Sequence, residues 1–241
     1  MIRLYQFPIS HYCEKIRWVL DFKKLDHQLI NMIPGLHIKQ TKKMGLRSAV
    51  PILQHENNFV QGSTKIIDYL DKQFPQKSLT PSDKKLESEV LAWENYIDKD
   101  VGIPVRLCIY NILLEYPEIV KPFFAHKGPW YGKLFLTFAF PKLRNKMRQF
   151  MNINDASSTV SKQKLSNAID KLNAHYQSKS FLVGEQFTRA DLTAAALLAP
   201  LMMPKQYGLN WPEQIPVKLQ ELMDEFENRL SWVDQFYKDY R

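Results

Sequence analysis

The pattern of apolar residues changes once along this chain, near residue 75, and this change constrains the fold more than any other feature. Between Ile2 and Phe74, the strand-like runs IRLYQF, HQLINM, AVPILQ and NFVQ alternate with helical runs. The run HENN between the last two strands suits a hairpin, so these strands are predicted to be antiparallel. Residues 1–75 are therefore predicted to form a small mixed sheet covered by helices.

The rest of the chain is predicted to be helical. The segment PQKSLTP has two prolines and no apolar periodicity, which is typical of a linker, and no convincing strand follows it. Helices are expected at residues 82–116 with a bend at Pro104, 130–151 with a bend at Pro141, 157–177, 189–203 and 217–230. The fold class is thus an α/β domain at 1–75 followed by an all-helical domain at 82–241.

Composition excludes several classes of protein. The chain has 241 residues, of which 45% are hydrophobic, and no run of about 18 apolar residues predicts a membrane-spanning helix. The N-terminus lacks the pattern of a signal peptide, and two distant cysteines do not indicate a disulfide framework, so a cytoplasmic protein is expected. The net charge of +8 comes without a nucleic-acid-binding motif, so no nucleic-acid partner is predicted.

One charged run and one apolar segment each have both a structural and a functional interpretation. The charged run HIKQTKKMGLR is interpreted as a solvated face that could also attract a small anion. The apolar segment GPWYGKLFLTFAF could form part of a substrate pocket, but a core or dimer role is preferred.

Reactive side chains gather where the first helix begins, in the stretch FPISHYCEKIRWVL. A helix N-terminus stabilises an anion such as a thiolate through its unpaired N–H groups and partial positive charge. Ser10 is best placed to donate a hydrogen bond to a thiolate, although a plain N-cap is the alternative. Cys13 is either a nucleophile or a small packed residue. Tyr12 and His11 could line the site, and no second histidine stands at metal-ligand spacing from His11, so no metal is predicted.

Two further segments offer backbone geometry suited to ligand binding. The Val50-Pro51 bond in SAVPIL is a candidate cis peptide, with an ordinary trans proline at a strand start as the alternative. Ser63 in VQGSTKIIDYL begins another helix, where its hydroxyl and N–H groups could receive a carboxylate.

Taken in order, SHYCEKIRWVL, AVPIL, GSTKIIDYLD and the helical remainder resemble the cytosolic glutathione transferase superfamily over essentially the whole chain. The resemblance implies a thioredoxin-like domain that binds glutathione, with Ser10 activating its sulfur. It also implies that Pro51 is the family's cis-proline, that the Val50 backbone pairs with the cysteinyl part of glutathione, and that Ser63 receives the γ-glutamyl carboxylate. A homodimer, in which the helical domain of each subunit packs on the thioredoxin-like domain of the other, is implied as well.

The helical half supports the resemblance. The segment FLVGEQFTRADLTAAALLAPL resembles the family's buried helix, and Thr188 and Asp191 stand at the spacing of an N-terminal capping box. This motif belongs to folding rather than to catalysis.

The chain departs from the family pattern in the glutathione-binding part. Family members commonly have an acidic residue directly before the serine of the third motif, where this chain has Gly62, preceded by Gln61. Gln61 or the dimer partner is a candidate replacement for that acid. The glycyl carboxylate of glutathione is assigned to His37, Lys39 or Lys42 without a choice among them.

The favoured function is a glutathione transferase that promotes attack of the glutathione thiolate on a small hydrophobic electrophile, as in detoxification. One alternative is a glutathione-dependent thiol transferase that uses Cys13. The other is a non-catalytic ligand-binding protein of the same fold, which the loss of the acidic residue at Gly62 favours.

Overall fold

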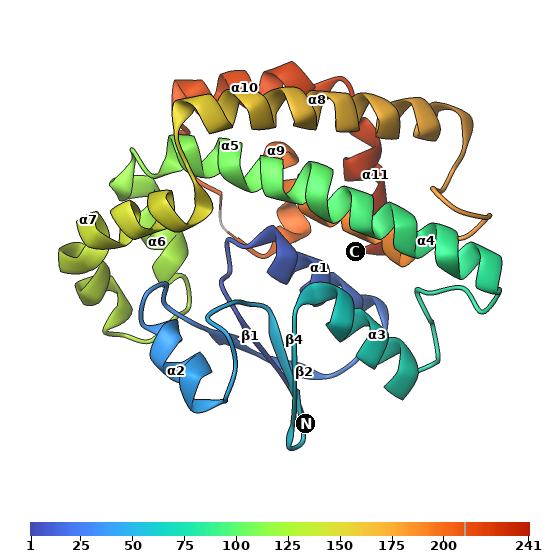
Figure 1. Cartoon of the computed structure of the whole chain (residues 1–241), viewed down its shortest axis with the longest axis horizontal. Helices are drawn as coiled ribbons and strands as arrows, with labels where there is room; N and C mark the ends of the chain where they lie inside the picture. The colour runs from blue at the N-terminus through green and yellow to red at the C-terminus, as the bar shows by residue number, and fades with distance from the viewer. Residues whose placement is uncertain (210) are drawn as a thin grey trace.

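The computed structural model describes residues 1–209 and 211–241 and divides them into a sheet domain and a helical domain (Figure 1). The sheet domain contains β1 (Ile2–Gln6), α1 (His11–Phe22), β2 (His27–Asn31), α2 (His37–Lys43), β3 (Ile52–His55), β4 (Asn58–Gln61) and α3 (Ser63–Gln73). The predicted mixed sheet with helical cover is confirmed. The short, polar helix α2 was not predicted as a helix, because its sequence HIKQTKK has no apolar periodicity.

The sheet has the strand order β2-β1-β3-β4. Strand β1 pairs with β2 in parallel, which requires the crossover through α1, and it pairs with β3 in the antiparallel sense. Strands β3 and β4 form the predicted antiparallel hairpin, with His55 opposite Asn58. Strand β1 is central, and its alternate residues Ile2 and Leu4 are buried, which fixes its register against the helices.

The helical domain lies above the sheet domain in Figure 1. It contains α4 (Lys84–Ile97), the π-helical turn η1 (Asp98–Gly102), α5 (Ile103–Leu113), α6 (Pro117–Ala125), α7 (Gly132–Met151), α8 (Asp155–Ser178), α9 (Arg189–Met202), the short 3₁₀ turn η2 (Lys205–Tyr207), α10 (Val217–Glu227) and α11 (Ser231–Tyr240). A π-helical turn, η1, ends two residues before Pro104, where a bend was predicted, and Pro141, the other predicted bend, lies within α7. Helices α6 and α11 were not predicted.

Helix α9 forms the centre of the helical domain, with every residue from Arg189 to Leu201 buried. The predicted capping box is present: the Thr188 N–H donates to Asp191 Oδ2 over 2.9 Å, and the Thr188 side chain accepts from the Ala190 N–H. Asp191 also accepts from the Leu182 N–H at 2.7 Å and from the Tyr176 hydroxyl at 3.0 Å. Its carboxylate therefore joins three segments of the helical domain, as a folding role requires.

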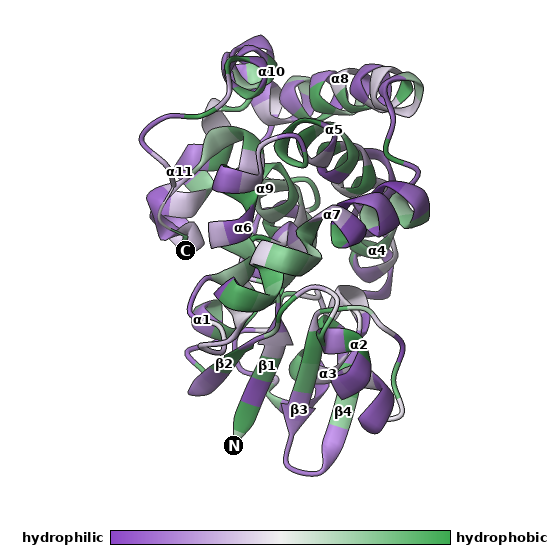
Figure 2. Cartoon of the chain, turned by 90° about the vertical axis from the view of Figure 1, so that its left-hand side faces the viewer, coloured by the Kyte–Doolittle hydropathy of each residue, from purple (hydrophilic) through white to green (hydrophobic). Residues whose placement is uncertain are grey.

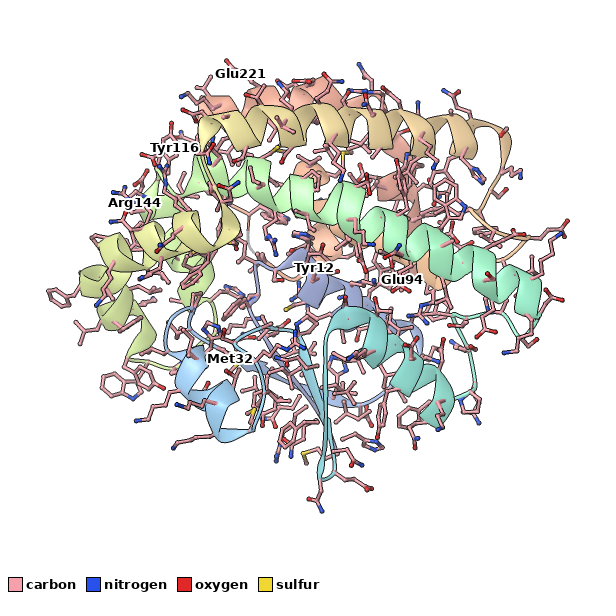
Figure 3. All side chains as sticks on the ribbon, in the orientation of Figure 1. Tyr12, Met32, Glu94, Tyr116, Arg144 and Glu221 are labelled. Atoms are coloured by element: carbon pink, nitrogen blue, oxygen red, sulfur yellow. The ribbon has the colours of Figure 1, made fainter. Side chains whose placement is uncertain are left out.

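A buried ionic cluster joins the two domains beneath α4. Lys15 Nζ on α1 lies 2.6 Å from Glu94 Oε1, and Arg189 Nε on α9 lies 2.8 Å from Glu94 Oε2. The second contact is ionic, since its geometry does not suit a hydrogen bond. Figure 3 places Glu94 at the junction of the domains, with Tyr12 of α1 facing the same junction. The cluster fixes how α1 meets the helical domain.

Candidate active site

A cavity of about 960 Å³ lies between the two domains. One wall consists of the start of α1, the segment before α2 and the residues before β3, and the other consists of α5, α6, α7 and the segment after α9. Apolar side chains from α5, α6 and α7 dominate its lining, and Figure 2 shows apolar ribbon where these helices face the sheet domain. A cavity of this size and polarity is suited to a small apolar molecule.

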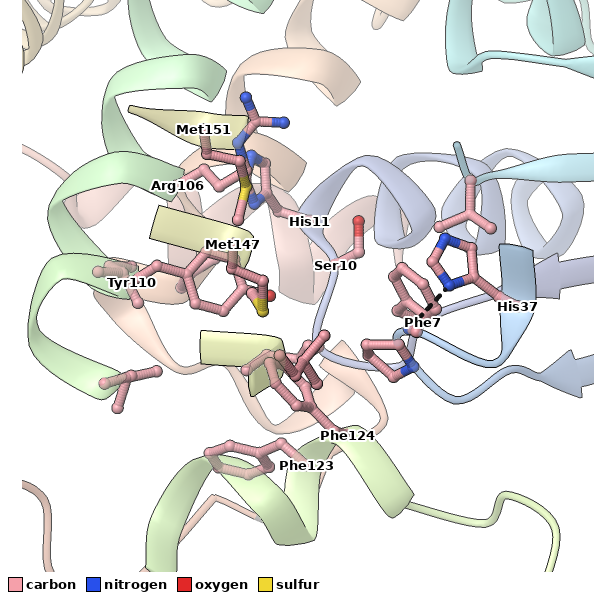
Figure 4. A pocket seen from close by; sticks show the side chains of 18 of the residues that line it. Phe7, Ser10, His11, His37, Arg106, Tyr110, Phe123, Phe124, Met147 and Met151 are labelled. Carbon is pink, nitrogen blue, oxygen red and sulfur yellow. Dashed lines mark hydrogen bonds between the residues drawn. The ribbon is translucent and has the colours of Figure 1, made fainter. Parts of the chain in front are cut away.

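Ser10 stands at the N-terminus of α1 on the wall of this cavity (Figure 4). Its backbone has the extended conformation of an N-cap, and its carbonyl accepts from the N–H groups of Cys13 and Glu14 at 2.9 Å. The hydroxyl makes no capping hydrogen bond. Ser10 is half-buried and lines the cavity, and its side chain also lies within hydrogen-bonding reach of the Cys13 thiol. The backbone of Ser10 is thus that of an N-cap, while its side chain does not take part in the cap.

Cys13, in the first turn of α1, does not reach the cavity. Its side chain is fully buried, and it does not belong to the cavity lining. Burial raises the pKa of the thiol, and hydrogen bonding from Ser10 and the Phe7 backbone offsets this shift only in part. A buried thiol with a raised pKa is a poor nucleophile, so the geometry favours the packing interpretation of Cys13.

His11 and Tyr12 connect the start of α1 to the turn η1. His11 Nε2 donates to the Gly102 carbonyl over 3.0 Å, which assigns the proton of the neutral ring to Nε2, and the Tyr12 hydroxyl donates to the Asp98 carbonyl at 2.7 Å. Burial, with a smaller contribution from Arg106, lowers the pKa of His11 to about 3, and burial raises that of Tyr12. Both side chains reach the cavity wall as neutral groups.

The two motifs predicted to bind glutathione lie side by side at the edge of the cavity. The Val50-Pro51 peptide is cis, as predicted, and the Pro51 carbonyl accepts from the Gly62 N–H at 3.0 Å. Val50 lines the cavity itself, whereas Pro51, Gly62 and Ser63 do not. Gly62 has φ +98°, a conformation in which an acidic side chain would be strained.

Gln61 is engaged in a structural role. Its amide nitrogen donates to the carbonyls of Arg47 at 2.8 Å and Ala49 at 2.7 Å, and its amide oxygen accepts from the Arg47 N–H at 3.2 Å. These bonds hold the segment that leads to the cis peptide. The side chain thus supports this segment, and its amide oxygen keeps one lone pair, so the replacement of the missing acid by Gln61 stays a prediction.

Of the candidates for the glycyl carboxylate, only His37 lines the cavity. Its Nδ1 accepts from the Gly35 N–H at 3.1 Å, and its ring packs edge-on against Phe7 with the centroids 4.8 Å apart. Lys39 is exposed on α2 outside the cavity lining, which agrees with the solvated face predicted for this run.

The contribution of α5 and α6 to the site was not predicted, whereas the segment GPWYGKLFLTFAF, part of which lies in α7, was considered for the pocket. Arg106 and Tyr110, one turn apart on α5, line the cavity with Phe123 and Phe124 of α6. Phe135 of the segment GPWYGKLFLTFAF lines it as well, so the preference for a core or dimer role was wrong for that residue. Spacing on one helix shows which residues share a face, but not which face borders a cavity made by another domain.

The described residues show no arrangement that would hold a metal ion: no three His, Cys, Asp or Glu side chains gather there. Residues 1–209 and 211–241 also contain no helix with both the length and the apolar character needed to cross a membrane.

Comparisons with known proteins match the two domains separately. Residues 4–78 match the family model of the glutathione S-transferase N-terminal domain, and residues 133–236 match that of the C-terminal domain. A glutathione S-transferase of Pseudomonas putida is 26% identical over 108 residues, which cover 45% of this chain and 49% of the relative. Protein LigF of Sphingobium is 35% identical over 103 residues, 41% of this chain and 40% of LigF. The chain thus spans about half or less of the length of these curated relatives.

Solved structures extend the similarity of fold over the whole chain. The beta-etherase LigF of Sphingobium has a TM-score of 0.63 at 20% identity, with 98% of each chain covered. A glutathione S-transferase of Methylobacillus flagellatus, solved with glutathione bound, has a TM-score of 0.58 at 18% identity, with 97% of this chain and 98% of that chain covered. The family models fall on the sheet domain and on most of the helical domain, and together they match more than half of the chain. This chain belongs to the glutathione S-transferase superfamily.

Proposed function

We propose that this chain is a glutathione transferase that activates the glutathione thiol at the N-terminus of α1 for attack on an electrophile bound in the interdomain cavity. The observation that carries the proposal is the position of Ser10, whose hydroxyl makes no capping bond and lies on the wall of an apolar cavity of about 960 Å³. Family membership and relatives named glutathione S-transferase support the same function.

In the proposed mechanism, the chain's own groups stabilise the thiolate before the electrophile reacts. The Ser10 hydroxyl donates to the sulfur, and the first N–H groups of α1 add their partial positive charge, so the thiol ionises more readily. The Val50 backbone holds the cysteinyl part, and Ser63, at the start of α3, receives the γ-glutamyl carboxylate. The sulfur then forms a bond to the electrophilic carbon, and a leaving group departs with the bonding electron pair.

The burial of Cys13 favours this mechanism over the thiol-transferase alternative. A mixed disulfide with glutathione requires an accessible thiolate, and the Cys13 side chain is fully buried with a raised pKa. Both cysteines are free and buried, which supports the proposal that the chain works in the reducing cytoplasm.

A calorimetric titration with glutathione, followed by an assay with chlorodinitrobenzene, tests the proposed function. We expect saturable binding of glutathione and conjugation above the uncatalysed rate. Because Gly62 offers no carboxylate to the γ-glutamyl amino group, binding should be weaker than in a variant of the family that has this acid. Binding without conjugation would identify a ligand-binding protein, and the absence of both would contradict the proposal.

We further propose that the chain forms a homodimer, as the family resemblance implies. Exposed apolar side chains on both domains support it, among them Phe59 on β4 and Leu91 on α4. Light scattering should give about twice the chain mass of 28.4 kDa, whereas a monomer at micromolar concentration would contradict the dimer.

A further inference from the structure

The charged side chains that line the interdomain cavity are all basic. The apolar lining is interrupted by the side chains of His11, His37, Arg106, Lys142 and Lys146, and no aspartate or glutamate belongs to the lining among the described residues. With both histidines neutral, the cavity carries three formal positive charges. A cavity for a neutral apolar molecule alone would not need this arrangement, because a charge next to an apolar wall loses hydration.

Arg106 is the cation placed deepest in the site. It comes from the second turn of α5, one turn before Tyr110, and its side chain is only partly exposed. Figure 4 shows it reaching from α5 toward His11, and its charge helps to lower the pKa of that ring. It therefore lies close to the start of α1, next to the residue that follows Ser10.

The described residues provide no partner for the Arg106 guanidinium, either as a hydrogen bond or as an ion pair. The nearest carboxylates along the chain are engaged elsewhere: Asp98 lies 3.2 Å from Lys15, and Asp100 lies 3.2 Å from Lys164. Each of the five guanidinium N–H groups is a donor, and a partly buried guanidinium without an acceptor favours the binding of an anion.

Lys142 and Lys146 extend this positive charge to the mouth of the cavity. Both are exposed on α7 and belong to the lining, together with apolar side chains of α6 and α7. Cations at the rim attract an anionic ligand toward the opening, and a cation inside then fixes its orientation. The arrangement is suited to a molecule with one apolar body and one acidic group.

We propose that the second substrate is an amphipathic organic anion, an aryl or alkyl carboxylate or sulfonate, whose acidic group pairs with Arg106 while its apolar body lies against α5, α6 and α7. The inference rests on the proposed function and specifies the class of its electrophile. The proposed contacts of the γ-glutamyl carboxylate and cysteinyl backbone of glutathione lie at Ser63 and Val50, and the candidates for its glycyl carboxylate also belong to the sheet domain, whereas Arg106 is on α5 in the opposite wall.

A pair of substrates, one charged and one neutral, tests the proposal when each catalysed rate is divided by the uncatalysed rate of the same substrate. We compare conjugation of a chlorodinitrobenzoate with that of its methyl ester in the wild type, in Arg106→Met and in Arg144→Met, the matched control outside the cavity lining. In Arg106→Met, kcat/KM for the carboxylate should fall about 10- to 100-fold, the loss expected for a charge-assisted hydrogen bond, while the value for the ester stays the same. Arg144→Met should leave both unchanged, and Arg106→Lys should recover part of the loss.

Equal losses for carboxylate and ester in Arg106→Met would overturn the proposal, because they would mean that Arg106 acts on the glutathione thiolate or on the fold. A wild type whose rate enhancement over the uncatalysed reaction is no larger for the carboxylate than for the ester would overturn it too. Circular dichroism and thermal unfolding confirm that Arg106→Met is folded before the kinetics are compared.

A binding measurement without glutathione separates this inference from the proposed function. Anilinonaphthalene sulfonate, a fluorescent amphipathic anion, should bind the wild type and Arg144→Met alike and bind Arg106→Met at least about 10-fold more weakly. The chlorodinitrobenzoate should displace the dye from the wild type better than the ester does. If these results hold while no conjugation occurs, the anion site stands and the transferase proposal fails. If the dye binds Arg106→Met as tightly as the wild type, the anion site is wrong even where conjugation is found.

Discussion

Acidification from pH 6.5 to about 4.5 should lower the free energy of unfolding by about 2–3 kcal/mol through His11 alone, because the folded chain holds this ring neutral down to a pKa of about 3. The unfolded chain takes up a proton near the ordinary pKa of 6.5. Between these two values the unfolded state binds one proton more than the folded state, so stability falls by about 1.4 kcal/mol for each pH unit of acidification. Above pH 6.5 the two states bind the same number at this site, and its contribution is constant.

Burial is the main cause of this shift, and it has a consequence for the site. The residue is 5% exposed, Arg106 adds positive charge beside the ring, and the hydrogen bond to the Gly102 carbonyl opposes these two effects only in part. Protonation would place a second cation next to Arg106 in a poorly hydrated space. Because His11 is the first residue of α1, releasing its ring would also disturb the helix start at which Ser10 stands.

Urea unfolding at a series of pH values checks this prediction in the wild type and in His11→Gln. Glutamine keeps an N–H donor for the Gly102 carbonyl and cannot take up a proton, so the variant should lose less stability on acidification. The two proteins are compared by how much the free energy of unfolding changes per pH unit. A loss of stability that is the same at every pH does not affect this comparison. Parallel curves for the two proteins would show that His11 is protonated in the fold.

Local signals allowed much of the sheet domain to be predicted from the sequence. Strand-like runs, the hairpin at HENN and the start of α1 depend on residues close together in the chain, and the structure confirms them. The cis bond at Pro51 and the Thr188 capping box are local in the same sense. Each of these features is decided mainly by the backbone preferences of a few neighbouring residues.

The composition of the cavity could not be predicted, because it depends on contacts between distant segments. Arg106 appears in the sequence as one cation in an apolar helix, and only the packing of α5 against α1 places it beside His11. The hydrogen bonds from the Gln61 amide to the carbonyls of Arg47 and Ala49 could not be predicted either, because they join residues that are 14 and 12 positions apart. Helix α6 begins with Pro117 and contains Pro122, so periodicity alone gave no reason to expect its aromatic residues in the site.

Ser10→Ala should reduce turnover of chlorodinitrobenzene by about 10- to 100-fold, since it removes one hydrogen bond to a charged group, worth about 1.5–3 kcal/mol. Glutathione affinity should change much less, because the proposed contacts to its peptide come from Val50 and Ser63. Cys13→Ala is the comparison, and we expect it to keep most of the activity, because the Cys13 side chain is fully buried away from the cavity.

The pH dependence of the rate distinguishes thiolate stabilisation from a general loss of geometry. If the Ser10 hydroxyl stabilises the thiolate by about 1.5–3 kcal/mol, its removal raises the pKa of the bound thiol by about one to two units. The rate of Ser10→Ala should then approach that of the wild type at high pH, where the thiol is ionised in both proteins. A loss of the same size at every pH would mean that Ser10 positions the substrate instead. If Cys13→Ala loses activity and Ser10→Ala does not, the Cys13 thiol rather than the Ser10 hydroxyl takes part in the reaction, despite its burial.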